Sequence, residues 1–309
     1  MNRFQEDDLR DLIKEVVSSY QPEKLKWLLE QPETLEEGVF DRGILKCVFT
    51  AGGPGSGKSF VADLVFGMRN SKGASTFENA SFLGNTGLKY VNSDRLFERG
   101  LNKAGISPSD LATIEQTDPA VWDAIQGASP DSIRNVAKDQ LNALKAFYTS
   151  GRLGLLVDGT GRRYKKTLGQ KEAMESLGYD TLMLFVDTTM EVALERNAAR
   201  SRKLPEDGVR QMWQDVQDNK DAYAELFGDN FVVVDNTEFG PPEDAIVDAA
   251  MGFVTAPVGN PIGQAWIEDE LEIRGVTTLE PGGPEGFRGS QQAADRIQKM
   301  RDERGKVDI

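Results

Sequence analysis

The sequence predicts an α/β fold in which a parallel sheet of about five strands is sandwiched between helices. Two observations support this fold class. Short runs of apolar and β-branched residues alternate along the chain with stretches of helical periodicity. The first of these runs leads into a glycine-rich turn, which is followed directly by a helix-like stretch. Parallel strands need helical crossovers of this kind, and ligands of such folds bind at the carboxyl ends of the strands.

The strand and helix patterns can be assigned in order along the chain. Apolar residues at helical spacing predict a helix from 133 to 148, with Gly151 as its stop signal. A second long helix is predicted from Val209 to Gly228. The five runs that have the composition of strands are 44–50, 88–92, 153–158, 181–187 and 230–235.

The two ends of the chain differ in character from the middle. We expect a helical segment at 1–40, a main domain at 41–255 and an irregular extension at 256–309, which is rich in Gly and Pro and should add little to the core. An apolar patch around Trp266 and a polar helix expected at 291–303 are candidate contacts for a protein partner. The alternative is a tail that packs on its own domain and buries Trp266.

Composition limits the chemistry. The 309 residues contain no histidine, so catalysis or metal binding must use carboxylates, lysines, arginines, hydroxyls and a hard cation such as Mg²⁺. The net charge of −14 argues against broad contact with nucleic acid, although a local basic groove is allowed. No apolar run approaches the roughly 18 residues of a membrane span. We therefore expect a cytoplasmic protein with no membrane segment.

A phosphate-binding loop is the most specific motif in the chain. It matches the Walker A pattern G-x-x-x-x-G-K-[ST] between the first strand and a helix. Backbone N–H groups of such a loop bind phosphate oxygens, helped by the positive end of the helix. Lys58 would reach the β- and γ-phosphates of ATP, and Ser59 would bind Mg²⁺. The loop consists of Gly52, Gly53, Pro54, Gly55, Ser56, Gly57, Lys58 and Ser59.

Two aspartates follow predicted strands. Asp94 comes after the second strand, where a general base could orient an acceptor hydroxyl and take its proton; the alternative is a helix cap or a residue that holds Mg²⁺-bound water. Asp158 comes after the third strand and is a candidate Mg²⁺ residue. Arg95, Thr160 and Arg162 are candidate contacts to the acceptor.

A basic cluster stands out in this acidic chain. Arg196 and Arg200 are four residues apart, so on a helix they would share one face and could close over a triphosphate. Arg202 is a further candidate contact to ATP. Asn236, after the last strand, is a candidate contact to the adenine. The alternatives are a solvated helix face balanced by nearby acids and, for Asn236, an ordinary turn.

Taken in order, four motifs resemble those of P-loop kinases of the zeta-toxin and polynucleotide-kinase group: G-G-P-G-S-G-K-S, V-N-S-D-R, V-D-G-T-G-R and E-R-N-A-A-R-S-R-K-L-P. The resemblance implies a P-loop NTPase-type fold that uses ATP and Mg²⁺. It implies a general base at Asp94, an acceptor segment at Asp158 and Thr160, and lid arginines at Arg196 and Arg200. Asp158 stands where zeta toxins more often have Glu.

The expected function is therefore a Mg²⁺-dependent kinase that transfers the γ-phosphoryl group of ATP to a hydroxyl of a small nucleotide-like acceptor. A zeta-toxin-like enzyme would phosphorylate a UDP-activated amino sugar. A polynucleotide kinase would take the 5′-hydroxyl of a nucleic-acid end, and a related enzyme a hydroxymethylated base. A third class, a non-catalytic nucleotide-binding switch that contacts a protein partner, remains open.

Overall fold

The computed structural model describes most of the central part of the chain. The expected N-terminal helices, the expected helix at 291–303 and Arg202 lie outside the described residues. The structure describes residues 38–41, 43–66, 86–200, 203–238, 240 and 242–273.

Contacts divide the chain into two compact units. Among the described residues, the first unit comprises Val91–Phe147, and the second comprises those before Val91 and those after Phe147. The domain boundaries expected from the sequence did not include this division. The second unit contains the phosphate-binding loop and nearly all of the sheet.

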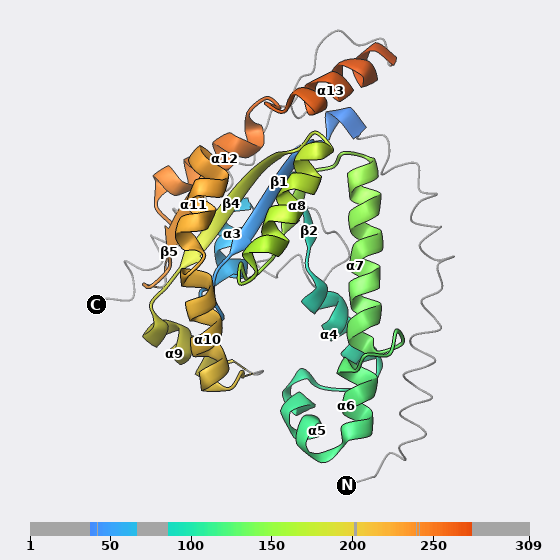
Figure 1. Ribbon diagram of the computed structural model, residues 1–309, viewed down its shortest axis with the longest axis vertical. Coiled ribbons are helices and arrows are strands. Elements are labelled where there is room, and N and C mark those ends of the chain that lie inside the picture. Colours follow the sequence, from blue (N-terminus) through green and yellow to red (C-terminus); the bar gives the residue numbers. More distant parts are fainter. Residues whose placement is uncertain are drawn as a thin grey trace, which may run out of the picture. The chain divides into compact units, whose positions relative to one another are not determined.

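The five predicted strands are present and form one sheet in the order β2-β3-β1-β4-β5. Figure 1 labels β1, β2, β4 and β5 of this sheet. The pairs β1–β3, β1–β4 and β4–β5 are parallel, with Cys47 of β1 opposite Leu155 and Thr181. Together with the glycine loop after β1, this is a P-loop NTPase-type α/β fold, as predicted. The strands are β1 Lys46–Ala51, β2 Lys89–Val91, β3 Leu155–Val157, β4 Asp180–Asp187 and β5 Phe231–Asp235.

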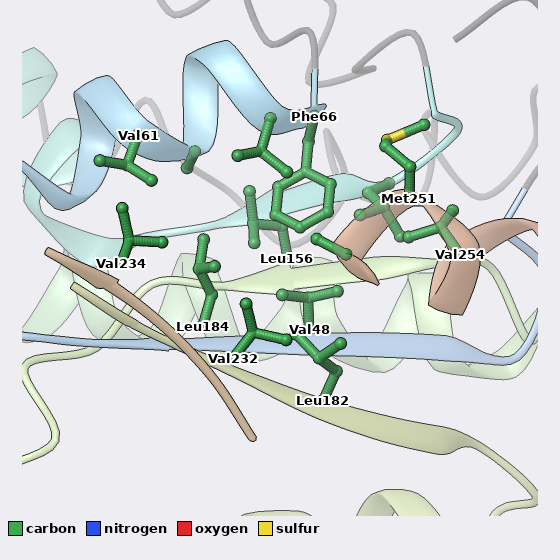
Figure 2. Packing of buried hydrophobic residues seen from close by; sticks show 14 of the residues in the cluster. Val48, Val61, Phe66, Leu156, Leu182, Leu184, Val232, Val234, Met251 and Val254 are labelled. Atoms are coloured by element: carbon green, nitrogen blue, oxygen red, sulfur yellow. The ribbon is translucent and has the colours of Figure 1, made fainter. Parts of the chain in front are cut away.

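The core of the second unit follows from the alternation of side chains along the strands. On one face, Val48 and Leu184 pack against α3 (Lys58–Phe66) and α12 (Asp244–Thr255), as Figure 2 shows. On the other face, Phe49 lies against Phe227, with ring centroids 6.0 Å apart. That face is covered by α8 (Tyr164–Ser176) and α11 (Lys220–Phe227), which contact β4.

The first unit has its own hydrophobic cluster, which includes the fully buried Phe97 and Ile125. Its long helix confirms the helix predicted from 133, and Gly100 passes so close that a Cβ there would lie 2.5 Å from Ile133 Cγ2. The elements of this unit are α4 Ser93–Lys103, η3 Pro108–Asp110, α5 Leu111–Thr117, α6 Pro119–Gln126 and α7 Ile133–Ser150, whose last three residues belong to the second unit.

The long helix predicted from Val209 to Gly228 is in fact two helices, α10 (Glu206–Gln217) and α11, followed by the 3-10 turn η4 (Gly228–Asn230). The break falls at Asp218 and Asn219. There the Asn219 side-chain amide donates to the carbonyl oxygens of Asp215, Gly161 and Arg162. Bonding to the distant Gly161–Arg162 loop fixes the chain where the helix would otherwise continue.

The segment beginning at 256 was expected to be irregular, but it contains helix α13 (Pro261–Ile273), which contacts the short turn η2 (Gly38–Phe40). Gly263 of this helix approaches the turn before β4 so closely that a Cβ would lie 2.2 Å from Gly178 O. The described part of this segment, which ends at Ile273, therefore packs against the rest of the second unit. Each described helix is too short or too polar to span a bilayer.

An ion pair at the start of β4 holds the chain that leads into α13. The Asp180 carboxylate accepts from Lys46 Nζ at 2.7 Å and from the backbone N–H groups of Gly259 and Asn260 at 2.8 and 2.9 Å. The Lys46 side chain is only 3% exposed. Removal of Asp180 would leave a buried ammonium group without its counter-charge.

We expect Asp180→Ala to lower the free energy of unfolding by roughly 3–5 kcal/mol, because a buried charge loses its partner. The melting temperature should fall by roughly 10 °C, as measured by circular dichroism. Asp229→Ala, at an exposed position in η4, is the matched control and should melt like the wild type. Equal melting of the two variants would contradict a structural role for this ion pair.

Candidate functional site

The phosphate-binding loop connects β1 to α3 and can be formed only with glycine at its turns. Gly55 and Gly57 have φ values of 81° and 83°, which are unfavourable for residues with a side chain. A Cβ on Gly55 would lie 2.5 Å from Ala193 O, and one on Gly57 would lie 2.3 Å from Asn236 Nδ2. The loop is therefore enclosed from outside by α9 (Met190–Ala198) and by the residue after β5.

Lys58 begins α3 and bends back over the loop. Its ammonium group donates to Gly52 O at 2.8 Å and to Gly53 O at 3.2 Å. Ser59, the next residue, is exposed. The first N–H groups of a helix have no partner within the helix, so this end of α3 offers donors to an anion.

Asn236 and Arg196 support the loop from its outer side. The buried Asn236 amide donates to Ser56 O at 2.7 Å. The Arg196 guanidinium donates to Asn236 O at 2.7 Å, to Thr237 O at 3.2 Å and to Gly55 O at 3.4 Å. Both side chains thus bond to carbonyl oxygens. The Asn236 side chain, expected at the adenine, lies beneath the phosphate-binding loop.

Asp158 is half-buried at the end of β3, between the ends of two neighbouring strands. Its carboxylate accepts from Thr50 Oγ1 of β1 at 2.8 Å and from the Tyr90 hydroxyl of β2 at 2.6 Å. These bonds fix the carboxylate at the carboxyl edge of the sheet. Within the described ranges, no group of three or more acidic or cysteine side chains is arranged to hold a metal ion.

The turn after β3 brings Thr160 and Arg162 to the same edge of the sheet. Thr160 O accepts from Gly52 N at 3.1 Å. The Arg162 guanidinium donates twice to Asp215 Oδ2 of α10, at 3.0 and 2.8 Å, while Gln211 donates to Asp215 Oδ1 at 2.7 Å. The hydrogen bonds from Gln211 and Arg162 lower the pKa of the Asp215 carboxyl. In this structure, Arg162 is held by α10.

The expected pairing of Arg196 and Arg200 on one helix face is wrong. Helix α9 ends at Ala198, and Arg200 lies exposed beyond it. The physical reason is Asn197, whose side chain bonds to both the N–H and the carbonyl of Leu204 and draws the chain back. A helix continuing through Arg200 would carry Leu204 away from Asn197.

Asp94 and Arg95 belong to the other compact unit. Asp94 lies in the first turn of α4, its backbone N–H donates to Asn92 Oδ1 at 2.6 Å, and its side chain is 63% exposed. Its carboxylate accepts from Arg134 Nη1 at 2.9 Å. Arg95 is half-buried.

Two further residues at the site, Trp213 and Asp187, were not among the predicted site residues. Trp213 of α10 lies against the loop, since a Cβ on Gly53 would be 3.3 Å from Trp213 Cδ1. Its indole N–H donates to Thr188 O at 2.8 Å. Asp187, at the end of β4, accepts from Lys220 and Gln217 and so anchors α10 and α11.

No protein-family model and no curated protein matches the chain. Among solved structures, a chain of the PezAT chromosomal toxin–antitoxin system of Streptococcus pneumoniae has 13% identity over 91% of this chain and 99% of its own, with a TM-score of 0.44. The AvrRxo1-ORF1:ORF2 complex in its native form has 14% identity over 94% of this chain and 89% of its own, with a TM-score of 0.45. That complex with ATP has 13% identity over the same shares, with a TM-score of 0.39.

With TM-scores of 0.39 to 0.45, the likeness carries no weight for activity, substrate or partner. The function must be inferred from the residues of this chain.

We expect Gly57→Ala to weaken the binding of Mg·ATP by at least about 10-fold, because a Cβ at this backbone angle is strained and displaces the Asn236 amide. Isothermal titration calorimetry measures the affinity. Gly252→Ala, at an open position in α12, is the matched control and should keep the wild-type affinity while gaining up to about 1 kcal/mol of stability. Unchanged affinity of Gly57→Ala would argue against nucleotide binding at the loop.

Proposed function

We propose that this protein is an ATP- and Mg²⁺-dependent kinase that phosphorylates a hydroxyl of a small nucleotide-like acceptor, with a UDP-activated amino sugar as the preferred class. The observation that carries the proposal is the way the phosphate-binding loop is held. The side-chain donors of Lys58, Asn236 and Arg196 go to carbonyl oxygens of the loop. This arrangement suits a loop whose N–H groups serve a polyphosphate.

The loop fits the phosphates of ATP. Among the described residues, the buried Ser56 hydroxyl of the loop has no hydrogen-bond partner. Phosphate oxygens accept hydrogen bonds from hydroxyl and N–H donors. We assign Lys58 to the β- and γ-phosphates, where its charge would act on the group being transferred.

Mg²⁺ would neutralise charge on the β- and γ-phosphates. Ser59 fits as a direct ligand, because its hydroxyl is exposed at the start of α3. Asp158 fits a role through Mg²⁺-bound water, because both of its oxygens already accept hydroxyl hydrogen bonds.

The transfer itself would be an in-line displacement. The acceptor oxygen forms a bond to the γ-phosphorus, the bond from that phosphorus to the β–γ bridging oxygen breaks, and ADP leaves. Asp94 is our candidate for the base that takes the acceptor proton. Thr160, Arg162 and Arg95 are candidate contacts to the acceptor. Arg196 bonds to the loop, so it is the better supported candidate of the two proposed lid arginines.

The acceptor class follows from charge and from the end of α9. A net charge of −14 favours a small acceptor over a nucleic-acid strand. Arg200 lies beyond the helix, so the R-x-x-x-R spacing that resembles polynucleotide kinases does not form one helix face. A 5′-hydroxyl end or a hydroxymethylated base is therefore the weaker alternative. A non-catalytic switch that contacts a protein partner through the C-terminal extension would need no acceptor base.

We expect the protein to transfer label from γ-labelled ATP to UDP-amino sugars and not to nucleosides or 5′-hydroxyl oligonucleotides tested separately. Lys58→Ala should lose this activity while keeping its circular dichroism spectrum, because Lys58 acts on charge in the transition state. Lys138→Ala, an exposed lysine on α7, is the matched control and should keep it. Labelling of oligonucleotides instead, with a steep dependence on salt, would favour the nucleic-acid acceptor. Labelling of no acceptor would favour the switch.

We expect Asp94→Asn to lower kcat for transfer by on the order of 10²-fold with little change in ATP affinity, because a positioned base contributes about that much. Steady-state kinetics and nucleotide titration separate the two effects. Asp110→Asn, an exposed aspartate in the same compact unit, should behave like the wild type. Weakened Mg·ATP binding with normal transfer would instead make Asp94 a metal residue.

A further inference from the structure

The Asp94 carboxylate has a partner that no motif predicts. Arg134, near the start of α7, donates from Nη1 to Asp94 Oδ1 at 2.9 Å. The two residues are 40 positions apart in the chain and lie in the same compact unit. The Arg134 side chain is 18% exposed, whereas that of Asp94 is 63% exposed. A fixed guanidinium thus contacts an otherwise exposed carboxylate.

Arg134 is itself held at two further points. Its Cζ lies 3.9 Å from the centre of the ring of Phe97, which is fully buried. Its Nε donates to Gln126 Oε1 at 3.3 Å. A planar guanidinium held by stacking and by a second hydrogen bond has few ways to turn. Its Nη1 therefore presents an N–H group in a defined direction.

The ion pair does not act mainly on stability. An ion pair with so exposed a carboxylate adds little to folding, because water screens it. Its effect is on geometry: an exposed aspartate otherwise samples several side-chain rotamers. With Arg134 on Oδ1, the carboxylate keeps one orientation, and none of the described residues donates to Oδ2.

We propose that Arg134 is a positioning residue that holds the Asp94 carboxylate in one orientation and leaves Oδ2 to take the acceptor proton. This inference rests on the proposed kinase function and on Asp94 as its base. In the transfer step, the acceptor proton moves to Oδ2 as the new bond to phosphorus forms. Arg134 contacts neither acceptor nor ATP in this account, so its loss changes kcat and spares binding.

The test measures transfer by the full-length chain in a double-mutant cycle. Arg134→Met keeps an unbranched side chain over Phe97 and removes every N–H donor. It should lower kcat roughly 10-fold, with the KM of the acceptor and the affinity for ATP within about 2-fold. Arg134→Lys should restore part of the rate. Lys138→Ala, one turn further along α7, is the control and should be unchanged.

The decisive comparison adds Arg134→Met to Asp94→Asn. If Arg134 acts through Asp94, the double variant should be no slower than Asp94→Asn. Multiplied losses, an unchanged kcat, or a raised KM with normal kcat would each overturn the proposal. If Arg134→Met does not fold, Gln126→Ala, which frees Arg134 Nε, takes its place in the same cycle. A wild type without transfer, or an Asp94→Asn variant with normal transfer, would overturn the proposed function as well.

Discussion

The glycine-rich loop after β1 has carbonyl oxygens that need donors, and several side chains around the loop supply them. Donors that support the loop bond to its carbonyl oxygens: Lys58 to Gly52 and Gly53, and Asn236 to Ser56. These donors come from α3 and from the residue after β5, so elements far apart in the sequence hold the loop.

Without histidine, the groups left to this chain for chemistry include carboxylates, lysines, arginines and hydroxyls, and the aspartates described above have different partners. Asp158 accepts from two hydroxyl groups, which keeps its charge available to a cation. Asp187 and Asp215 are paired with a lysine and an arginine and serve to hold helices in place. Asp94, in the other compact unit, is both paired and exposed. Asp94 and Asp215 both accept from an arginine, but the Asp94 side chain is 63% exposed and that of Asp215 is 27% exposed.

The sequence predicted the strands and the phosphate-binding loop because their signals are local: runs of apolar residues and a fixed spacing of glycines. It failed where distant residues decide the outcome. The break between α10 and α11 depends on Asn219 bonding to Gly161, 58 positions away. The side-chain amide of Asn197 ends α9 before Arg200 through a bond to Leu204. The Arg134–Asp94 pair spans 40 positions. No pattern within a short window encodes such contacts.

The central place of β1 has a consequence for synthesis of the chain. Both neighbours of β1 in the sheet are made much later than β1 itself, and Lys46 is 134 residues ahead of its partner Asp180. At a rate of about 5–20 residues per second, a ribosome needs on the order of ten seconds to cover that interval. During this time, an apolar strand has both edges unpaired, the condition that favours aggregation and binding by chaperones. Expression at lower temperature or with extra chaperone should therefore increase the yield of folded protein.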